Sequence, residues 1–377
     1  MVGLVSAWRN WQERREILRD VRRIQADNHE LNRFKARDEL TDALKALDLN
    51  DTRKATAIWT AAVAQYPREV GQSPLALDVL VKLRRFDEAE AMMLQGLKRS
   101  PREIFFHKAL ALIARHRGDL PSAIEQYAAI RKKFPGVWEG YVLGAQSLAA
   151  AKRLEEADAL IEQAMELFWD EVCAFLEYGR LAEVRSDWTE TLRRWNLVQE
   201  RFPTWGFGFL GSARALLELE RYDEAEALLT EMRVRFPNDS ARYVLLARCA
   251  ELRGEIPEAV KRWRTRVERF PLESHGYSNA ADALEKMGQV QEAEAVLRAG
   301  IDRFPTDPKH MIELAKMFGR VGAYAEAAEA WAALRDVMPT YEEAYRLGAD
   351  ALRRAGQIEQ ADALTDEARR KFESSQT

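Results

Sequence analysis

The sequence predicts an all-α protein, a solenoid of repeated helical hairpins, because three regular spacings run through it. In the first, a dipeptide ending in proline returns every 34 residues, as in Phe202-Pro203, Phe236-Pro237, Phe270-Pro271 and Phe304-Pro305. In the second, alanine recurs with the same period, at Ala55, Ala89, Ala123, Ala157, Ala225, Ala259, Ala293, Ala327 and Ala361. The third is a longer period of 68 residues, carried by large aromatic side chains. Two independent series with one period favour a repeat architecture over ordinary globular domains.

Residues 1–35 precede the repeats, which we place at residues 36–375. This N-terminal segment predicts an amphipathic helical extension, with an apolar side and several arginines: Trp8, Trp11, Arg15, Leu18 and Arg22. Tryptophan and arginine together can hold such a helix at an anionic membrane surface. The alternatives are a cap on the first repeat and pairing with a second copy of the chain.

Each 34-residue unit contains two short amphipathic helices, as residues 241–271 illustrate. Tyr243, Ala247 and Ala250 lie at helical spacing on the first helix, which Gly254 then ends. The second helix carries its own apolar stripe, and a proline closes it. Two such helices cannot bury their apolar faces alone, so neighbouring units must stack.

Three units depart from this pattern. Ser73-Pro74 interrupts the first helix of the second unit, which we expect to start late. Trp169 replaces the closing proline of the fourth unit, so we expect its second helix to run on toward Asp170. The last unit ends in the polar stretch RRKFESSQT, which suits a cap.

The 68-residue period concerns one position of the second helix. Trp59, Tyr127, Trp195, Trp263 and Trp331 occupy it in alternate units, and medium-sized residues occupy it in the others. The intervening set is Met93, Ile161, Leu229, Leu297 and Thr365. We interpret the aromatic residues as core side chains and not as a ligand cage, because large and medium residues alternate in packed interiors.

The units resemble the tetratricopeptide repeat (TPR) family, whose 34-residue unit is a helical hairpin. The resemblance rests on Tyr243, Ala247, Ala259, Trp263 and Pro271, and on their counterparts in the other units. It covers about nine-tenths of the chain. It implies a right-handed superhelix of about ten hairpins with a pair super-repeat, in which the first helices line a concave groove. It also implies a non-catalytic scaffold for protein–protein interaction.

A dinucleotide-binding motif is also present by spacing alone, as Gly206, Gly208 and Gly211 follow the pattern G-x-G-x-x-G. That motif binds pyrophosphate only between a strand and a helix. Here the three glycines fall on the first helix of a repeat and follow a helix that ends at Pro203. We therefore expect them to permit close helix packing.

The candidate binding surface follows from the resemblance. An arginine recurs every 34 residues on three successive first helices, at the ninth position of the repeats that begin at residues 172, 206 and 240. With the apolar residues nearby, the predicted set is Leu176, Arg180, Phe207, Leu210, Arg214, Val244 and Arg248. An apolar strip beside arginines suits a protein or peptide partner with an acidic group. The alternative is a self-paired face, in which Glu183, Glu218 and Glu251 neutralise the arginines within their own helices.

Composition argues against other functions. The net charge is −4 and the pI is about 5.9, so we expect no nucleic-acid partner. No catalytic, metal-binding or cofactor-binding motif stands out, and we expect none of these sites and no enzyme activity. Two distant cysteines favour a reducing, cytoplasmic location. The alternative function is a membrane-associated assembly factor of a cell-envelope or polysaccharide-biogenesis complex, held at the inner face of the membrane by residues 1–35. Partner identity and oligomeric state are left open, and a homo-oligomer is one alternative.

Overall fold

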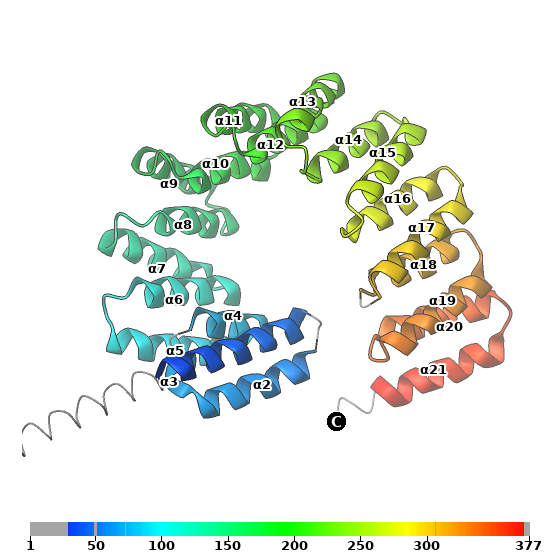
Figure 1. The fold of residues 1–377 in the computed structure, drawn as a ribbon, viewed down its shortest axis with the longest axis horizontal. Helices are drawn as coiled ribbons and strands as arrows, with labels where there is room; N and C mark the ends of the chain where they lie inside the picture. The colour runs from blue at the N-terminus through cyan, green and yellow to red at the C-terminus, as the bar shows by residue number, and fades with distance from the viewer. Residues whose placement is uncertain (1–28, 49–50, 72, 306, 373–377) are drawn as a thin grey trace, which may run out of the picture. The chain divides into compact units, whose positions relative to one another are not determined.

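A computed structural model of the protein describes residues 29–48, 51–71, 73–305 and 307–372. Every regular element in these ranges is a helix, and successive helices pair into hairpins (Figure 1). This confirms the all-α prediction, and the hairpins follow the 34-residue register. The chain divides into two compact units, Met1–Leu181 and Ala182–Thr377.

The first unit begins, within the described ranges, with a continuous helix over residues 29–48. Its further helices are α2 (Thr52–Gln65), α3 (Pro67–Val70), α4 (Pro74–Lys82), α5 (Phe86–Arg99), α6 (Ile104–Arg117), α7 (Leu120–Lys133), α8 (Glu139–Ala150), α9 (Leu154–Leu167) and most of α10 (Val172–Arg185). Even-numbered helices from α4 onward are the first helices of their repeats, and odd-numbered helices from α5 onward are the second. The predicted N-terminal amphipathic helix lies outside the described ranges, and with it Trp8, Trp11, Arg15, Leu18 and Arg22.

The second unit continues the same alternation. Its helices are α11 (Trp188–Arg201), α12 (Gly206–Glu218), α13 (Tyr222–Arg235), α14 (Ala241–Leu252), α15 (Ile256–Arg269), α16 (His275–Lys286), α17 (Val290–Arg303), α18 (Lys309–Arg320), α19 (Tyr324–Val337), α20 (Glu342–Arg354) and α21 (Ile358–Phe372). Sequence neighbours pack on one another throughout the unit, and α12 also contacts α14.

Nine hairpins in the described ranges turn through a residue with a left-handed backbone, where positive φ favours glycine. Glycine fills this position five times, at Gly118, Gly254, Gly288, Gly322 and Gly356. Four hairpins instead hold a residue with a side chain there, at Arg84, Lys152, Ser186 and Glu220, with φ between 56° and 63°. The role that the sequence assigned to Gly254, ending the first helix, is confirmed.

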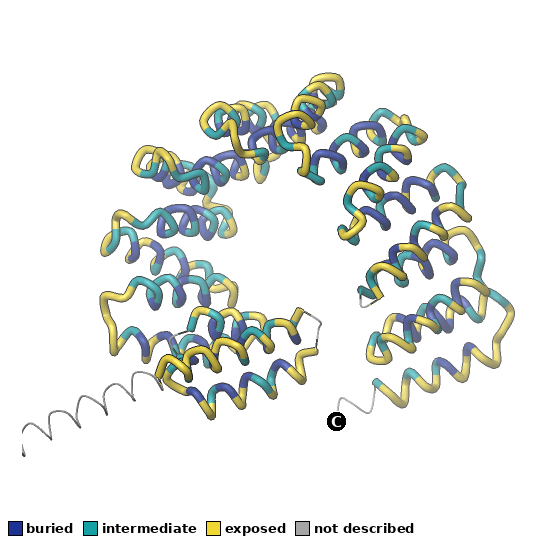
Figure 2. The backbone as a smooth tube through the Cα atoms, in the orientation of Figure 1, coloured by how far each residue is buried: buried dark blue, intermediate teal, exposed yellow. Residues whose placement is uncertain are grey.

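Within each compact unit the core lies where neighbouring helices face each other, as the buried stretches in Figure 2 show. All members of the aromatic series are buried, from Tyr127 at 0% exposure to Trp195 at 4%. Met93, Ile161, Leu229 and Leu297 are buried between them. The interpretation of these residues as core side chains is therefore confirmed.

Large and small residues complement each other where one repeat meets the next. At four interfaces, a residue on the second helix of one repeat faces the residue ten places later, on the first helix of the next repeat. Gly96 faces Phe106, Ile130 faces Gly140, Arg266 faces Gly276 and Gly300 faces His310. In each pair one partner is glycine, so the two helix backbones can approach around a single large side chain.

Of the glycines at 206, 208 and 211, the second and third permit close helix packing, as expected. A side-chain carbon on Gly208 would lie 2.7 Å from the backbone nitrogen of Gln199, and one on Gly211 would lie 2.1 Å from the Trp195 ring. Both contacts are on α11, and no strand lies in the described ranges. The close approach of α11 and α12 thus requires glycine at these two positions.

The irregular repeats agree with the sequence in one case and differ in another. The first helix of the second repeat does start late, with α4 beginning at Pro74. The expected extension of α9 toward Asp170 is wrong, because the helix ends at Leu167. Phe168 leaves the helical conformation as Phe134 and Phe202 do, and its ring packs edge-on against Tyr141 at 5.3 Å. The second helix thus ends at the half-buried aromatic residue whether or not a proline follows it.

Candidate functional site

The exposed face of α12 carries three of the predicted binding residues. Phe207, Leu210 and Arg214 are spaced three and four residues apart, which places them on one side of the helix. Phe207 is 51% exposed, and its ring lies 6.1 Å from that of Trp205, which is 46% exposed. Leu210 is half-buried. Two neighbouring aromatic rings in solvent form an apolar surface that the fold itself leaves uncovered.

Arg214 is held in place by Glu183, which lies on the preceding first helix. Its Nη1 donates to both carboxylate oxygens of Glu183, at 3.0 and 3.1 Å. The indole Nε1 of Trp195 also donates to Glu183, at 2.8 Å. A carboxylate that accepts from a buried indole cannot move freely, so it orients the guanidinium group. Nε and Nη2 of Arg214 bond to no described residue.

Arg248 projects from α14, one turn after the half-buried Val244. It is exposed, and among the described residues none forms an ion pair with it. Glu251 accepts a 2.8 Å hydrogen bond from the indole Nε1 of Trp263. The pairs expected within the helices, Arg248 with Glu251 and Arg214 with Glu218, do not form, because the tryptophan and the adjacent repeat provide the partners instead.

The corresponding face of the first unit carries Leu176 and Arg180 on α10. Leu176 is half-buried and Arg180 is exposed, with its Nη1 3.8 Å from the carboxylate of Glu177 rather than paired with Glu183. Glu177 is buried and also accepts a 2.7 Å bond from Gln146, which in turn accepts a 2.8 Å bond from Arg115. Three first helices are therefore linked by one polar chain.

Burial dominates the electrostatics of Glu177. It raises the pKa of the carboxyl above its ordinary value, although the Gln146 hydrogen bond and the charges of Arg180 and Arg115 oppose the change. Where it is ionised, this carboxyl lies 3.8 Å from Arg180 and offsets part of the arginine charge on this face. It leaves Arg180 less able to attract an anion than Arg248, which has no such neighbour.

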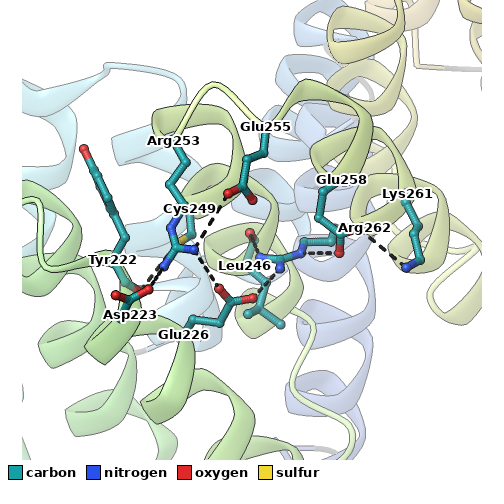
Figure 3. Close-up of polar contacts among 10 residues, drawn as sticks. All are labelled: Tyr222, Asp223, Glu226, Leu246, Cys249, Arg253, Glu255, Glu258, Lys261 and Arg262. Atoms are coloured by element: carbon teal, nitrogen blue, oxygen red, sulfur yellow. Dashed lines mark hydrogen bonds and ion pairs between the residues drawn. The ribbon is translucent and has the colours of Figure 1, made fainter.

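A network of charged side chains fixes α14, and with it Arg248, against its neighbours (Figure 3). Arg262 of α15 donates to the backbone oxygen of Leu246 at 2.8 Å and also to the carboxylates of Glu226 and Glu258. Arg253, directly after α14, bonds to Asp223 and shares Glu226 with Arg262. Three helices, α13, α14 and α15, are thus joined through two guanidinium groups.

Burial lowers the pKa of Arg262, but its bonds to Glu258 and Glu226 outweigh that effect and hold the pKa above the ordinary value. Arg262 therefore stays charged and keeps both carboxylates engaged. The network supports the position of α14.

Spacing within one helix did not predict the hydrogen bonds that Glu183 and Glu251 accept from tryptophan. Each glutamate lies twelve residues before a tryptophan of the 68-residue series, and this spacing is the signal in the sequence that could have predicted the pairs. Within the described ranges, His, Cys, Asp and Glu side chains form no group of three that could hold a metal ion. The same ranges contain no helix that is both long enough and apolar enough to cross a membrane.

Comparison with known proteins identifies the repeats. Models described as tetratricopeptide repeat match residues 75–137, 108–172, 210–274 and 274–317, together more than half of the chain. No curated protein matches this chain.

Several solved structures are similar in fold. A chain of the APC/C hetero-tetramer Cut9–Hcn1 is 12% identical with a TM-score of 0.42, over 83% of this chain and 63% of that one. A tetratricopeptide repeat protein from Parabacteroides merdae is 16% identical with a TM-score of 0.42, over 66% and 98%. YrrB, described as a TPR protein with an unusual peptide-binding site, is 21% identical with a TM-score of 0.35, over 51% and 97%. From its repeat models and its hairpin register, the chain belongs to the tetratricopeptide repeat family.

Proposed function

We propose that the protein is a non-catalytic scaffold that binds an acidic segment of a partner protein on the exposed face of α12 and α14. Tetratricopeptide repeat proteins are in general protein–protein interaction scaffolds, which supports the class of function. The observation that carries the finer proposal is Arg248, an exposed cation without an ion-pair partner among the described residues, beside an uncovered apolar surface.

The chemistry of the face fits an acidic peptide. Phe207 and Trp205 offer apolar area, and Leu210 and Val244 extend it as half-buried side chains. Arg214 presents Nε and Nη2, which is the pair of donors that grips a carboxylate in a two-bond fork. Because Glu183 already orients the group, less side-chain freedom is lost when a ligand binds. Leu176 and Arg180 hold the same positions on α10 and form a separate part of the proposal.

The test is affinity capture from native lysate with the full chain and single charge reversals. Arg214→Glu and Arg248→Glu should each lose a partner that the unmodified protein retains. Arg233→Glu is the matched control, since Arg233 is an exposed arginine on α13 that also pairs with no described residue. Arg180→Glu tests the first unit by itself.

Two outcomes would count against the proposal. Retention of every partner by Arg248→Glu would remove the arginine face from consideration. Equal loss with Arg233→Glu would show that only net charge matters. The membrane-associated alternative depends on residues 1–35, and co-sedimentation with anionic vesicles before and after removal of residues 1–24 separates it from the scaffold.

A further inference from the structure

The tryptophans of the 68-residue series differ in what their indole N–H groups bond to. Trp195 donates to Glu183 and Trp263 donates to Glu251, both at 2.8 Å. In each case the glutamate lies twelve residues earlier, on the first helix of the same repeat. The equivalent position before Trp331 is Gly319. One repeat of the second unit therefore lacks the carboxylate that its own tryptophan would bind.

Nothing in the described chain replaces that carboxylate. Among the described residues none accepts a hydrogen bond from the indole of Trp331, although the side chain is only 3% exposed. A side-chain carbon placed on Gly319 would meet no atom within 4 Å. The space is part of a cavity of about 280 Å³ between α18, α19 and α20, and Trp331 and Gly319 both line it. The side chain as a whole is buried, but its N–H is not among the enclosed polar atoms of the described chain, so it reaches the open space and can meet an acceptor there.

The remaining wall of the cavity is rich in cations. Lys316, Arg320 and Arg354 line it, against a single acidic residue, Asp350. Arg354 pairs with Asp350 at 3.0 Å, and Arg320 pairs with Glu285 at 2.7 Å. Lys316 is exposed and forms no ion pair within the described ranges. The cavity thus combines an unused N–H donor with an unpaired ammonium group, and both favour an anion.

We propose that this cavity receives the side-chain carboxylate of a glutamate from a partner protein, which bonds to the Trp331 indole as Glu183 and Glu251 bond to theirs. The chain itself shows twice that a glutamate carboxylate fits against this indole at 2.8 Å. Lys316 supplies the compensating charge. The site is separate from the arginine face of α12 and α14, and it does not depend on that face.

The test follows the indole N–H resonance of Trp331 in the full-length protein by nuclear magnetic resonance, with Trp331→Phe to assign it. The probe is glutamate blocked as its N-acetyl N′-methylamide, and the control is the same derivative of glutamine. The Trp331 resonance should move with the glutamate probe at millimolar concentration, while the Trp195 and Trp263 resonances stay in place. No movement, or equal movement with the glutamine control, would overturn the proposal.

Substitution of Gly319 gives a second, independent reading. Gly319→Glu supplies the carboxylate from within the chain, so it should shift the Trp331 resonance without ligand and abolish the response to the probe. Gly319→Ala is the matched control, because it fits the same open space without a carboxylate and should keep the response. A persistent response in Gly319→Glu would place the probe elsewhere.

A partner could supply a carboxylate from a glutamate side chain or from its C-terminus. N-acetylglycine, which offers only a terminal carboxylate, distinguishes these two sources. A stronger response to it than to blocked glutamate would overturn the side-chain assignment. Failure here is also distinguishable from failure of the arginine face, since Arg214→Glu and Arg248→Glu alter residues outside this cavity.

Discussion

The complementarity between successive repeats predicts that Gly96→Ile destabilises the unmodified protein but stabilises the Phe106→Gly variant. Gly96 lies under the ring of Phe106, whereas the next interface has the reverse order, with Ile130 over Gly140. Replacing Gly96 by Ile and Phe106 by Gly together would therefore reproduce, at the α5–α6 contact, the arrangement found at the α7–α8 contact.

The single changes should both be costly. A side-chain carbon on Gly96 would lie 2.1 Å from the Phe106 ring, so Gly96→Ile alone should destabilise the protein by about 1–3 kcal/mol or more through overpacking. Phe106 is 5% exposed, and Phe106→Gly should cost about 4–6 kcal/mol, from the lost ring and the flexible backbone. In the Phe106→Gly background the isoleucine enters a vacated space and should recover about 2–3 kcal/mol.

The measurement is urea unfolding of the four proteins, combined with amide hydrogen exchange in α5 and α6. Exchange is needed because repeat proteins can open locally, and it reports the interface directly. Protection in both helices should rank the double variant above Phe106→Gly. If Gly96→Ile lowered protection by the same amount with or without Phe106, the two positions would not be coupled and the packing argument would be wrong.

Two further predictions concern single positions. Glu220→Gly should raise the free energy of unfolding by up to about 1 kcal/mol, because Glu220 has φ of 57° where five other hairpins use glycine, and a lower melting temperature would contradict this. Glu177→Gln should be more stable than the unmodified protein at pH 7. Because burial raises the folded pKa of Glu177 above its ordinary value of 4.5, the carboxyl contributes stability below that value and loses it as pH rises through the folded pKa. The advantage of Glu177→Gln should therefore shrink as pH falls toward 4.5, and a constant gap in urea unfolding across this range would refute the assignment.

Part of the candidate surface could be read from the sequence, and part could not. Position 9 of the first helices is exposed at Arg180, Arg214 and Arg248, as the register predicts. Their partners were not predictable from spacing within one helix. Glu183 bonds to Arg214 from 31 residues away, since equivalent turns of adjacent first helices lie side by side. Whether the predicted residues bind a partner is for the capture experiment to decide.

The sequence alone determined the fold class, the hairpin register and the buried aromatic series, because these depend on periodic apolar residues and on where the chain can turn. Only the tertiary structure decided how charge is distributed over the exposed faces. Glu251 was expected to pair with Arg248 and instead accepts a hydrogen bond from Trp263. Gly319 carried no prediction, and in the structure it lines a cavity beside Trp331. Local periodicity reports which side of a helix is buried. Which groups form hydrogen bonds depends on the distances between repeats and on which polar groups lose contact with water. Both are set only when the helices pack.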